Sequence, residues 1–211
     1  MRPSRLLGPE DRARIEEAVR AAEANTSGEI VVSVKARCGR HAAAPWRLGV
    51  SLAAIALLGS VWLPIEGSPV ELFVLQLAAL AIAYLACLLD PIRHAFVSER
   101  ELQTKAEAAA LHAFHEHGLR LTEGRTGILI FVALFEHRVV VLADEAIDQA
   151  LGPDERWETV VEAVLEGLRG GRAADGIIEA VGRCGAMLAH PLPAAPDDRD
   201  EIPRGLVLID E

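Results

Sequence analysis

Aromatic residues and cysteines are both scarce in this chain of 211 residues. Phe, Trp and Tyr together make up 4% of it, and there are three cysteines, Cys38, Cys87 and Cys184. The cysteines are odd in number, lie far apart and match no metal-binding spacing, which argues against a disulfide framework. This pattern fits a protein kept in a reducing compartment.

Positive charge is also in short supply. The chain has 21 Lys and Arg against 31 Asp and Glu, which gives a formal net charge of -10. A nucleic-acid-binding protein needs clustered basic side chains to displace counterions from phosphates. No nucleic-acid partner is therefore expected.

Charge of either sign is missing from two long stretches, residues 48–65 and 72–89, although 25% of the chain is charged. Each stretch of 18 residues would be about 27 Å long as a helix, close to the ~30 Å of a bilayer's hydrocarbon core. A short segment rich in proline and glycine joins them. The sequence predicts a transmembrane helical hairpin over residues 46–90. The alternative, a pair of core helices in a soluble protein, would require more surrounding mass than this chain offers.

The charges beside the hairpin predict its orientation. Lys35, Arg37, Arg40 and Arg47 precede the first stretch, Arg93 and Arg100 follow the second, and the tip carries only Glu66 and Glu71. By the positive-inside rule, both termini are expected in the cytoplasm and the tip on the opposite side. We expect a multi-pass protein of the inner (cytoplasmic) membrane, with the lipid bilayer as one partner.

Outside the hairpin, helix-like and strand-like segments alternate. Helices are expected at 9–24, 98–117, 156–168 and 173–189, and strands at 29–34, 126–134 and 138–143. The continuous apolar run of 126–134 is typical of a central strand that is buried on both faces. Alternating helices and strands predict an α/β fold, a three-layer α/β/α sandwich with a small mixed sheet. The hairpin would interrupt this domain, which would be split into residues 1–41 and 94–190.

The C-terminal residues 191–211 form a tail rich in proline and aspartate. Its last apolar run, residues 205–209, has two interpretations. It adds an edge strand to the sheet, or it binds a partner.

Several of these segments together resemble the TPM domain, in a branch of short bacterial predicted membrane proteins. They are Ser27-Gly-Glu-Ile-Val-Val32, Leu121-Thr-Glu-Gly-Arg-Thr-Gly-Ile-Leu-Ile-Phe-Val132, Glu136-His-Arg-Val-Val-Val-Leu-Ala-Asp-Glu-Ala-Ile147 and Trp157. The resemblance covers most of residues 10–185 outside the hairpin. It lies in the order and spacing of the segments, since each one alone is an ordinary strand sequence.

The resemblance implies an α/β/α sandwich in a membrane-tethered domain that takes part in assembly or repair of membrane complexes and in regulation of membrane receptors. It also implies an acid phosphatase activity, attributed to a plant relative, as the alternative. This chain departs from the family in two ways. A hairpin follows its first strand, and it has Leu142-Ala-Asp144 where much of the family has a glycine-rich turn.

Polar residues gather at the start of the predicted central strand, 126–134, and after the next strand, 138–143. Arg125 precedes one strand and Asp144 follows the next, and a tight turn at residues 136–137 would bring these ends together. One interpretation is an ion pair, with Asp144 also capping a helix. The other is a small polar pocket for an anion or a metal. The candidate ligand-binding or partner-binding residues are Thr122, Arg125, Thr126, Arg138, Asp144 and Glu145.

Catalytic patterns are absent. His112, His115, Glu116 and His117 share one helix but form no His-Glu-x-x-His arrangement, so a solvated helix end is expected there. Cys87 and Arg93 have a phosphatase-like spacing without the glycines of a phosphate cradle. No nucleotide-binding loop or nucleophile elbow occurs either.

The sequence therefore predicts no catalytic residue, cofactor or metal. It favours a noncatalytic, membrane-anchored module that binds, assembles or stabilises complexes of integral membrane proteins. The alternative is a membrane-bound, phosphatase-like hydrolase with its site at the Arg125/Asp144 end of the sheet.

Overall fold

The computed structural model describes residues 2–62, 68–151, 157–194, 201–202 and 205–210. The chain forms two compact units. One consists of the chain up to Cys38 together with the chain from Gln103 onward, and the other runs from Gly39 to Leu102.

The first unit is built around a mixed sheet of four strands in the order β3-β2-β1-β4. The strands are β1 (Glu29–Lys35), β2 (Gly127–Ala133), β3 (Arg138–Ala143) and β4 (Leu206–Ile209). β1 is parallel to both β2 and β4, whereas β2 and β3 are antiparallel. The α/β class, the mixed sheet and the tight turn between β2 and β3 are thus confirmed. The tail supplies the edge strand β4, one of the two interpretations of its apolar run.

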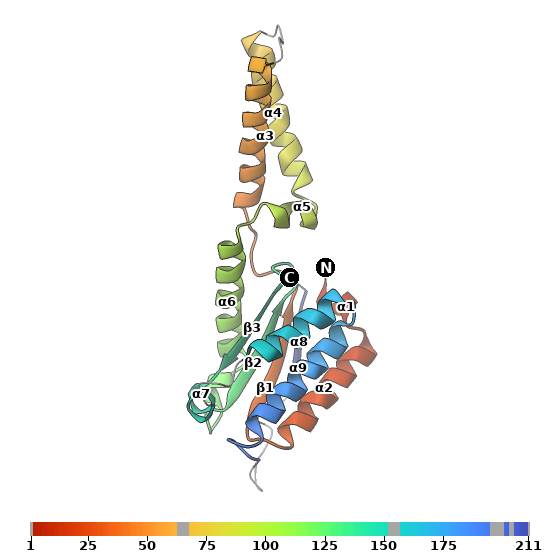
Figure 1. Ribbon diagram of the computed structural model, residues 1–211, viewed down its shortest axis with the longest axis vertical. Helices are drawn as coiled ribbons and strands as arrows, with labels where there is room; N and C mark the ends of the chain where they lie inside the picture. Colours follow the sequence, from red (N-terminus) through yellow and green to blue (C-terminus); the bar gives the residue numbers. More distant parts are fainter. Residues whose placement is uncertain (1, 63–67, 152–156, 195–200, 203–204, 211) are drawn as a thin grey trace. The chain divides into compact units, whose positions relative to one another are not determined.

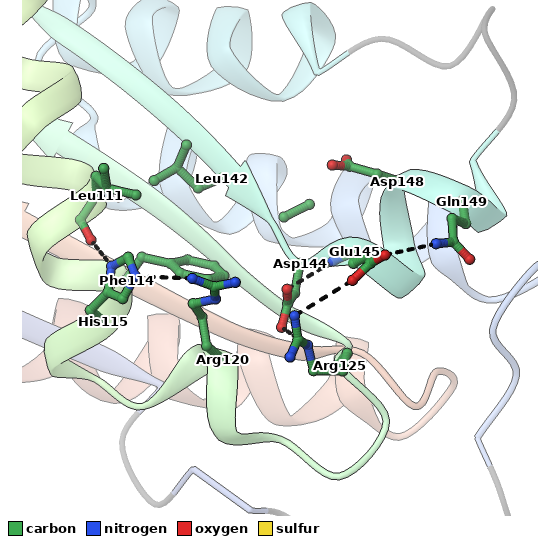
Figure 2. A pocket seen from close by; sticks show the side chains of 11 residues that line it. Leu111, Phe114, His115, Arg120, Arg125, Leu142, Asp144, Glu145, Asp148 and Gln149 are labelled. Atoms are coloured by element: carbon green, nitrogen blue, oxygen red, sulfur yellow. Dashed lines mark hydrogen bonds and ion pairs between the residues drawn. The ribbon is translucent and has the colours of Figure 1, made fainter.

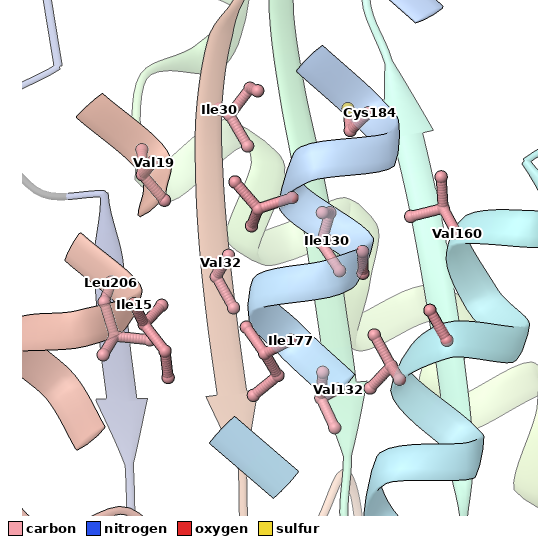
Figure 3. Packing of buried hydrophobic residues seen from close by; sticks show 14 of the residues in the cluster. Ile15, Val19, Ile30, Val32, Ile130, Val132, Val160, Ile177, Cys184 and Leu206 are labelled. Carbon is pink, nitrogen blue, oxygen red and sulfur yellow. The ribbon is translucent and has the colours of Figure 1, made fainter. Parts of the chain in front are cut away.

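Alternate residues of the two central strands face opposite sides of the sheet, as the pleat requires. Ile30, Val32, Ile130 and Val132 belong to one buried cluster, shown in Figure 3. Their neighbours Val31, Leu129 and Phe131 belong to a second cluster on the other face. Every residue of β2 is buried, which confirms the predicted central strand.

The two faces of the sheet are covered unequally. The first face packs against α2 (Pro9–Glu23), α8 (Glu158–Arg169) and α9 (Ala173–Leu188). The second packs against α6 (Glu99–Glu116), which contributes Ala106, Ala110, Ala113 and Phe114 from its part beyond Gln103 (Figure 1). The three-layer sandwich therefore has one thick and one thin helical layer. β3 is half-buried along its whole length.

Short helices complete this unit. They are α1 (Pro3–Leu6), the 3-10 helix η1 (Leu119–Leu121) and α7 (Glu145–Ala150). A helix capped by Asp144 was one interpretation of the sequence, but its bounds were not predicted, because six residues are too few to show helical periodicity. Ser98 caps the start of α6, accepting a hydrogen bond from the backbone nitrogen of Glu101 at 3.3 Å, as its position before the helix predicts.

The second unit contains α3 (Ala43–Trp62), α4 (Pro69–Ala86) and α5 (Asp90–Ala95). Leu48, near the start of α3, packs against Ala83 and Cys87 at the end of α4, so the two helices are antiparallel neighbours. α3 begins five residues before the charge-free stretch. α4 begins at Pro69 because Ser68 caps it, accepting from the nitrogen of Glu71. Residues 63–67 of the hairpin tip, including Glu66, lie outside the described residues.

Both helices are long and apolar enough to cross a membrane. In their most apolar windows, Ala43–Ser60 and Pro69–Ala86, only 17% and 6% of the residues are buried. The large exposed apolar side chains of the described chain all lie between Trp46 and Leu89, except Leu111 and Leu121. A core helix of a soluble protein is mostly buried, so these two helices do not fit that alternative.

Candidate functional site

The segment that leads from α6 into β2 is held tightly against the sheet. Gly118 has a φ of 74°, a conformation that glycine adopts without strain, and it turns the chain out of α6 into η1. The hydroxyl of Thr122 accepts a hydrogen bond from the nitrogen of Thr126 at 3.1 Å. At Gly127, a Cβ atom would collide with the backbone carbonyl of Leu119. This close packing fixes the residues between Leu119 and Gly127.

Arg125 lies in this segment with a φ of 55°, unusual for a residue with a side chain. Its Nε is 3.1 Å from Oδ2 of Asp144, and its terminal nitrogen is 3.6 Å from Glu145. Oδ1 of Asp144 accepts a hydrogen bond from the nitrogen of Glu145 at 2.9 Å and so caps α7. The ion pair and the cap expected from the sequence are both present. Oδ1 of Asp144 thus accepts a hydrogen bond, whereas Oδ2 is buried and has the ion-pair contact with Arg125 but no hydrogen bond.

These residues form one wall of a cleft of about 400 Å³. Figure 2 shows the cleft between α6, the segment after it, the end of β3 and α7. It opens there because α6 and η1 leave the end of β3 partly exposed. The lining side chains are Leu111, Phe114, His115, Arg120, Arg125, Leu142, Ala143, Asp144, Glu145, Asp148 and Gln149.

Arg120 and His115 meet on the α6 side of the cleft. Nδ1 of His115 lies 2.7 Å from the carbonyl oxygen of Leu111, and Nε2 lies 3.4 Å from a terminal nitrogen of Arg120. Because a carbonyl oxygen only accepts and a guanidinium only donates, the ring must carry its proton on Nδ1. No ion pair joins Arg120 to a carboxylate in the described part of the chain. It therefore brings a positive charge that its neighbours leave uncompensated.

The six candidate residues from the sequence do not all meet. Arg125, Asp144 and Glu145 line the cleft. Thr122 and Thr126 are buried beside it and hold the segment in place instead of lining the cavity. Arg138 lies at the opposite end of β3, paired in register with Ala133, while Ala143 is paired with Ile128 at the cleft end. Arg138 is therefore not part of the cleft, because Val139, Val140 and Val141 separate it from Leu142, the first residue of β3 that lines the cleft.

The α6 half of the cleft was not predicted from the sequence. His115 was expected at a solvated helix end, and no role in a site was predicted for Arg120, Leu111 or Phe114. The sequence holds only a weak signal for these residues, because the packing of α6 across the sheet is what brings them opposite Asp144. His112 forms an exposed pair with Glu116 at 3.7 Å, as a solvated helix end predicts.

Cys38 and His117 are among the groups of this unit whose pKa is shifted. At the end of the sheet opposite the cleft, burial raises the pKa of the Cys38 thiol to about 12, and the carboxylate of Glu136 adds to the effect. Burial lowers the pKa of His117, just after α6, and Glu116 partly opposes this. A raised pKa leaves Cys38 as an unreactive thiol at neutral pH.

The TPM domain family model matches residues 91–187. The chain carries a TPM domain. The matched range holds β2, β3 and the helices from α6 to α9, while β1 and β4, which complete the sheet of this TPM domain, lie outside it.

One solved structure shares the fold. It is the NMR structure of the BA42 protein from the psychrophilic bacterium Bizionia argentinensis, with a TM-score of 0.58 and 21% sequence identity. The alignment covers 95% of this chain and 94% of that one. The chain has no match among curated proteins. At 21% identity the similarity shows the fold alone.

Proposed function

We propose that this TPM-domain protein is a noncatalytic module, anchored in the inner membrane by the α3–α4 hairpin, that binds and stabilises other integral membrane proteins. The main support for membrane anchoring is the exposure of large apolar side chains on the hairpin. Trp46, Ile55, Phe73 and Leu85 are each more than 60% exposed, and side chains of this kind belong in lipid.

The topology of the sheet supports two crossings. β1 comes before the hairpin in the chain and lies between β2 and β4, which come after it. A sheet assembled from both flanks requires both flanks on the same side of the membrane. Two crossings, by α3 and α4, satisfy this requirement, and the arginines beside the hairpin favour the cytoplasmic side.

The base of the hairpin has polar side chains suited to a membrane surface. Arg47 donates to the carbonyl of Phe96 at 3.1 Å and lies 3.5 Å from Glu101. Arg93 donates through Nε to the carbonyl of Cys87 at 2.8 Å and so satisfies an acceptor at the end of α4. Long basic side chains in such positions extend toward lipid headgroups.

The chemistry of the cleft favours binding over catalysis. Its described lining contains no Ser, Thr or Cys side chain that would serve as a nucleophile. Asp144 uses one oxygen for Arg125 and the other for the cap of α7. A hydrolase at this end of the sheet would need a free nucleophile and a base, so the phosphatase alternative has less support.

Topology is tested by labelling single cysteines in intact cells, in a background without Cys38, Cys87 and Cys184. A cysteine at Ser68 is expected to react with a membrane-impermeant maleimide, and one at Glu166 only after the cells are opened. Labelling of Glu166→Cys in intact cells would reverse the proposed orientation. Recovery of the chain in the soluble fraction after mild lysis would overturn the anchor.

Binding is tested by crosslinking in native membranes, followed by purification and identification of the attached proteins. We expect a defined set of integral membrane proteins whose amounts fall when this chain is deleted. The purified chain should hydrolyse p-nitrophenyl phosphate no faster than its Asp144→Asn variant. A turnover lost in that variant would favour the hydrolase instead.

A further inference from the structure

We propose that the cleft of the TPM domain binds a small organic monocarboxylate with an apolar body, held at its charged end by Arg120. This proposal does not depend on membrane anchoring or on a protein partner. It rests on the size of the cleft, on its apolar wall and on the uncompensated charge of Arg120.

The cleft has the size of a small-molecule site. Its volume of about 400 Å³ lies within the range of ligand pockets, roughly 300–1,000 Å³. A continuous apolar wall is formed by Leu111 and Phe114 from α6 and by Leu142 from β3 (Figure 2). Leu111 is 53% exposed although a helix-on-sheet interface lies beside it. An apolar ligand body would cover this surface.

The charges of the cleft are arranged unevenly. Arg125 is already paired with Asp144 and Glu145, which leaves little positive potential on that side. Arg120 lies on the α6 side, next to Phe114 and His115, with its one described polar contact to a neutral imidazole (Figure 2). An anionic group beside Phe114 would receive charge-assisted hydrogen bonds from Arg120.

The same charges select the class of anion. Asp144, Glu145 and Asp148 all line the cleft, and a second negative charge on the ligand would be repelled by them. A phosphate group carries between one and two charges at neutral pH, whereas a carboxylate carries one. The single uncompensated guanidinium therefore fits a monocarboxylate better than a phosphate ester. The ligand class differs from the substrate of a phosphatase.

The test uses the full chain in phosphatidylcholine nanodiscs and the probe hexanoate, with hexanol as its neutral counterpart. Binding is followed by NMR of labelled leucine methyl and arginine side-chain groups, which separates the cleft from the lipid-facing hairpin. We expect saturable shifts at Leu111, Leu142 and Arg120 with hexanoate, and weaker binding of hexanol.

Substitutions make the test specific. Arg120→Gln should weaken hexanoate binding by about tenfold or more, because it removes a charged donor. Arg169→Gln, an exposed arginine at the end of α8, is the matched control and should leave affinity unchanged. Leu142→Asn should also weaken hexanoate binding, because it removes part of the apolar wall. The Arg120 signal should still shift when hexanoate binds to this variant.

Three results would overturn the proposal. They are the absence of saturable shifts at the cleft, equal affinity for hexanoate and hexanol, and unchanged affinity in Arg120→Gln. Inorganic phosphate that shifts the same signals at lower concentration than hexanoate would show that the cleft prefers a more highly charged anion. That result would also overturn it.

Discussion

At the scale of single residues, Asp144 has two separate roles in the fold. It pairs with Arg125, whose side chain is 44% exposed, and its own side chain, 6% exposed, caps α7. The sequence predicted both contacts, since a tight turn between two strands brings the residue before the first close to the residue after the second. The sequence could not reveal that Arg125 adopts a left-handed conformation, because Gly124 beside it is the residue that more often does.

The two roles of Asp144 can be separated by substitution. Asp144→Ala should lower the free energy of unfolding by about 1–2 kcal/mol, because it removes the cap as well as the pair. Arg125→Ala should cost about 1 kcal/mol or less, because the pair is half-exposed. Thermal melts of both single variants and the double variant give the coupling energy, expected below about 1 kcal/mol.

Asp144→Asn is the control, since an asparagine still caps a helix but carries no charge. It should resemble Arg125→Ala. If Asp144→Asn destabilises the chain as much as Asp144→Ala, the charge and not the cap is the larger contribution.

His117 predicts a pH dependence of stability. Burial lowers its pKa below the ordinary value of 6.5, so the unfolded chain takes up a proton at a higher pH than the folded chain does. The stabilising contribution is present above pH 6.5 and is lost as the pH falls from that value through the lower pKa of the folded chain. His117→Gln should flatten the decline in melting temperature between pH 7 and about pH 5. An identical slope in the variant would show that other groups cause the decline.

At the scale of secondary structure, the long elements were predictable and the short ones were not. β2 could be recognised because a strand buried on both faces is apolar without interruption, and α9 because a long apolar face lies between Gly171 and Pro191. The role of β4 stayed open, because its pairing with β1 joins segments that lie about 170 residues apart. The cleft was missed for the same reason. It depends on which part of the sheet α6 leaves uncovered.

The packing of α8 on α9 predicts opposite effects on stability for glycine-to-alanine substitutions at two positions of α9. A Cβ on Gly176 would lie 2.7 Å from both the carbonyl oxygen of Ala163 and the Cα of Gly167, whereas nothing lies within 4 Å of one on Gly182. Gly176→Ala should destabilise the domain by about 1–3 kcal/mol through overpacking. Gly182→Ala should stabilise it by up to about 1 kcal/mol through helix propensity.

Denaturant unfolding of these two variants in the same detergent measures both effects. If both substitutions changed the free energy of unfolding in the same direction, α8 and α9 would not approach as closely as the structure places them.

At the scale of the whole molecule, the sequence predicted a TPM-like domain interrupted by an apolar hairpin. The structure divides the chain at Cys38/Gly39 and Leu102/Gln103. The sequence prediction placed the boundaries at 41 and 94, and the hairpin unit of the structure also contains α5 and the first residues of α6. Composition locates the apolar helices themselves, but it does not show which adjoining polar segments pack with them.

The first unit should fold without the second. Its sheet and both buried clusters are made from the chain up to Cys38 and the chain from Gln103 onward. We therefore expect that replacing residues 39–102 by a flexible Gly/Ser linker of about 20 residues yields a soluble protein with one cooperative unfolding transition.

A matched fragment that starts at Gln103 lacks β1, the strand between β2 and β4, and should not fold, because no strand would join the remaining two parts of the sheet. Circular dichroism during urea titration distinguishes the two outcomes. Non-cooperative unfolding of the linked protein, or a cooperative transition in the fragment without β1, would contradict the interrupted-domain architecture.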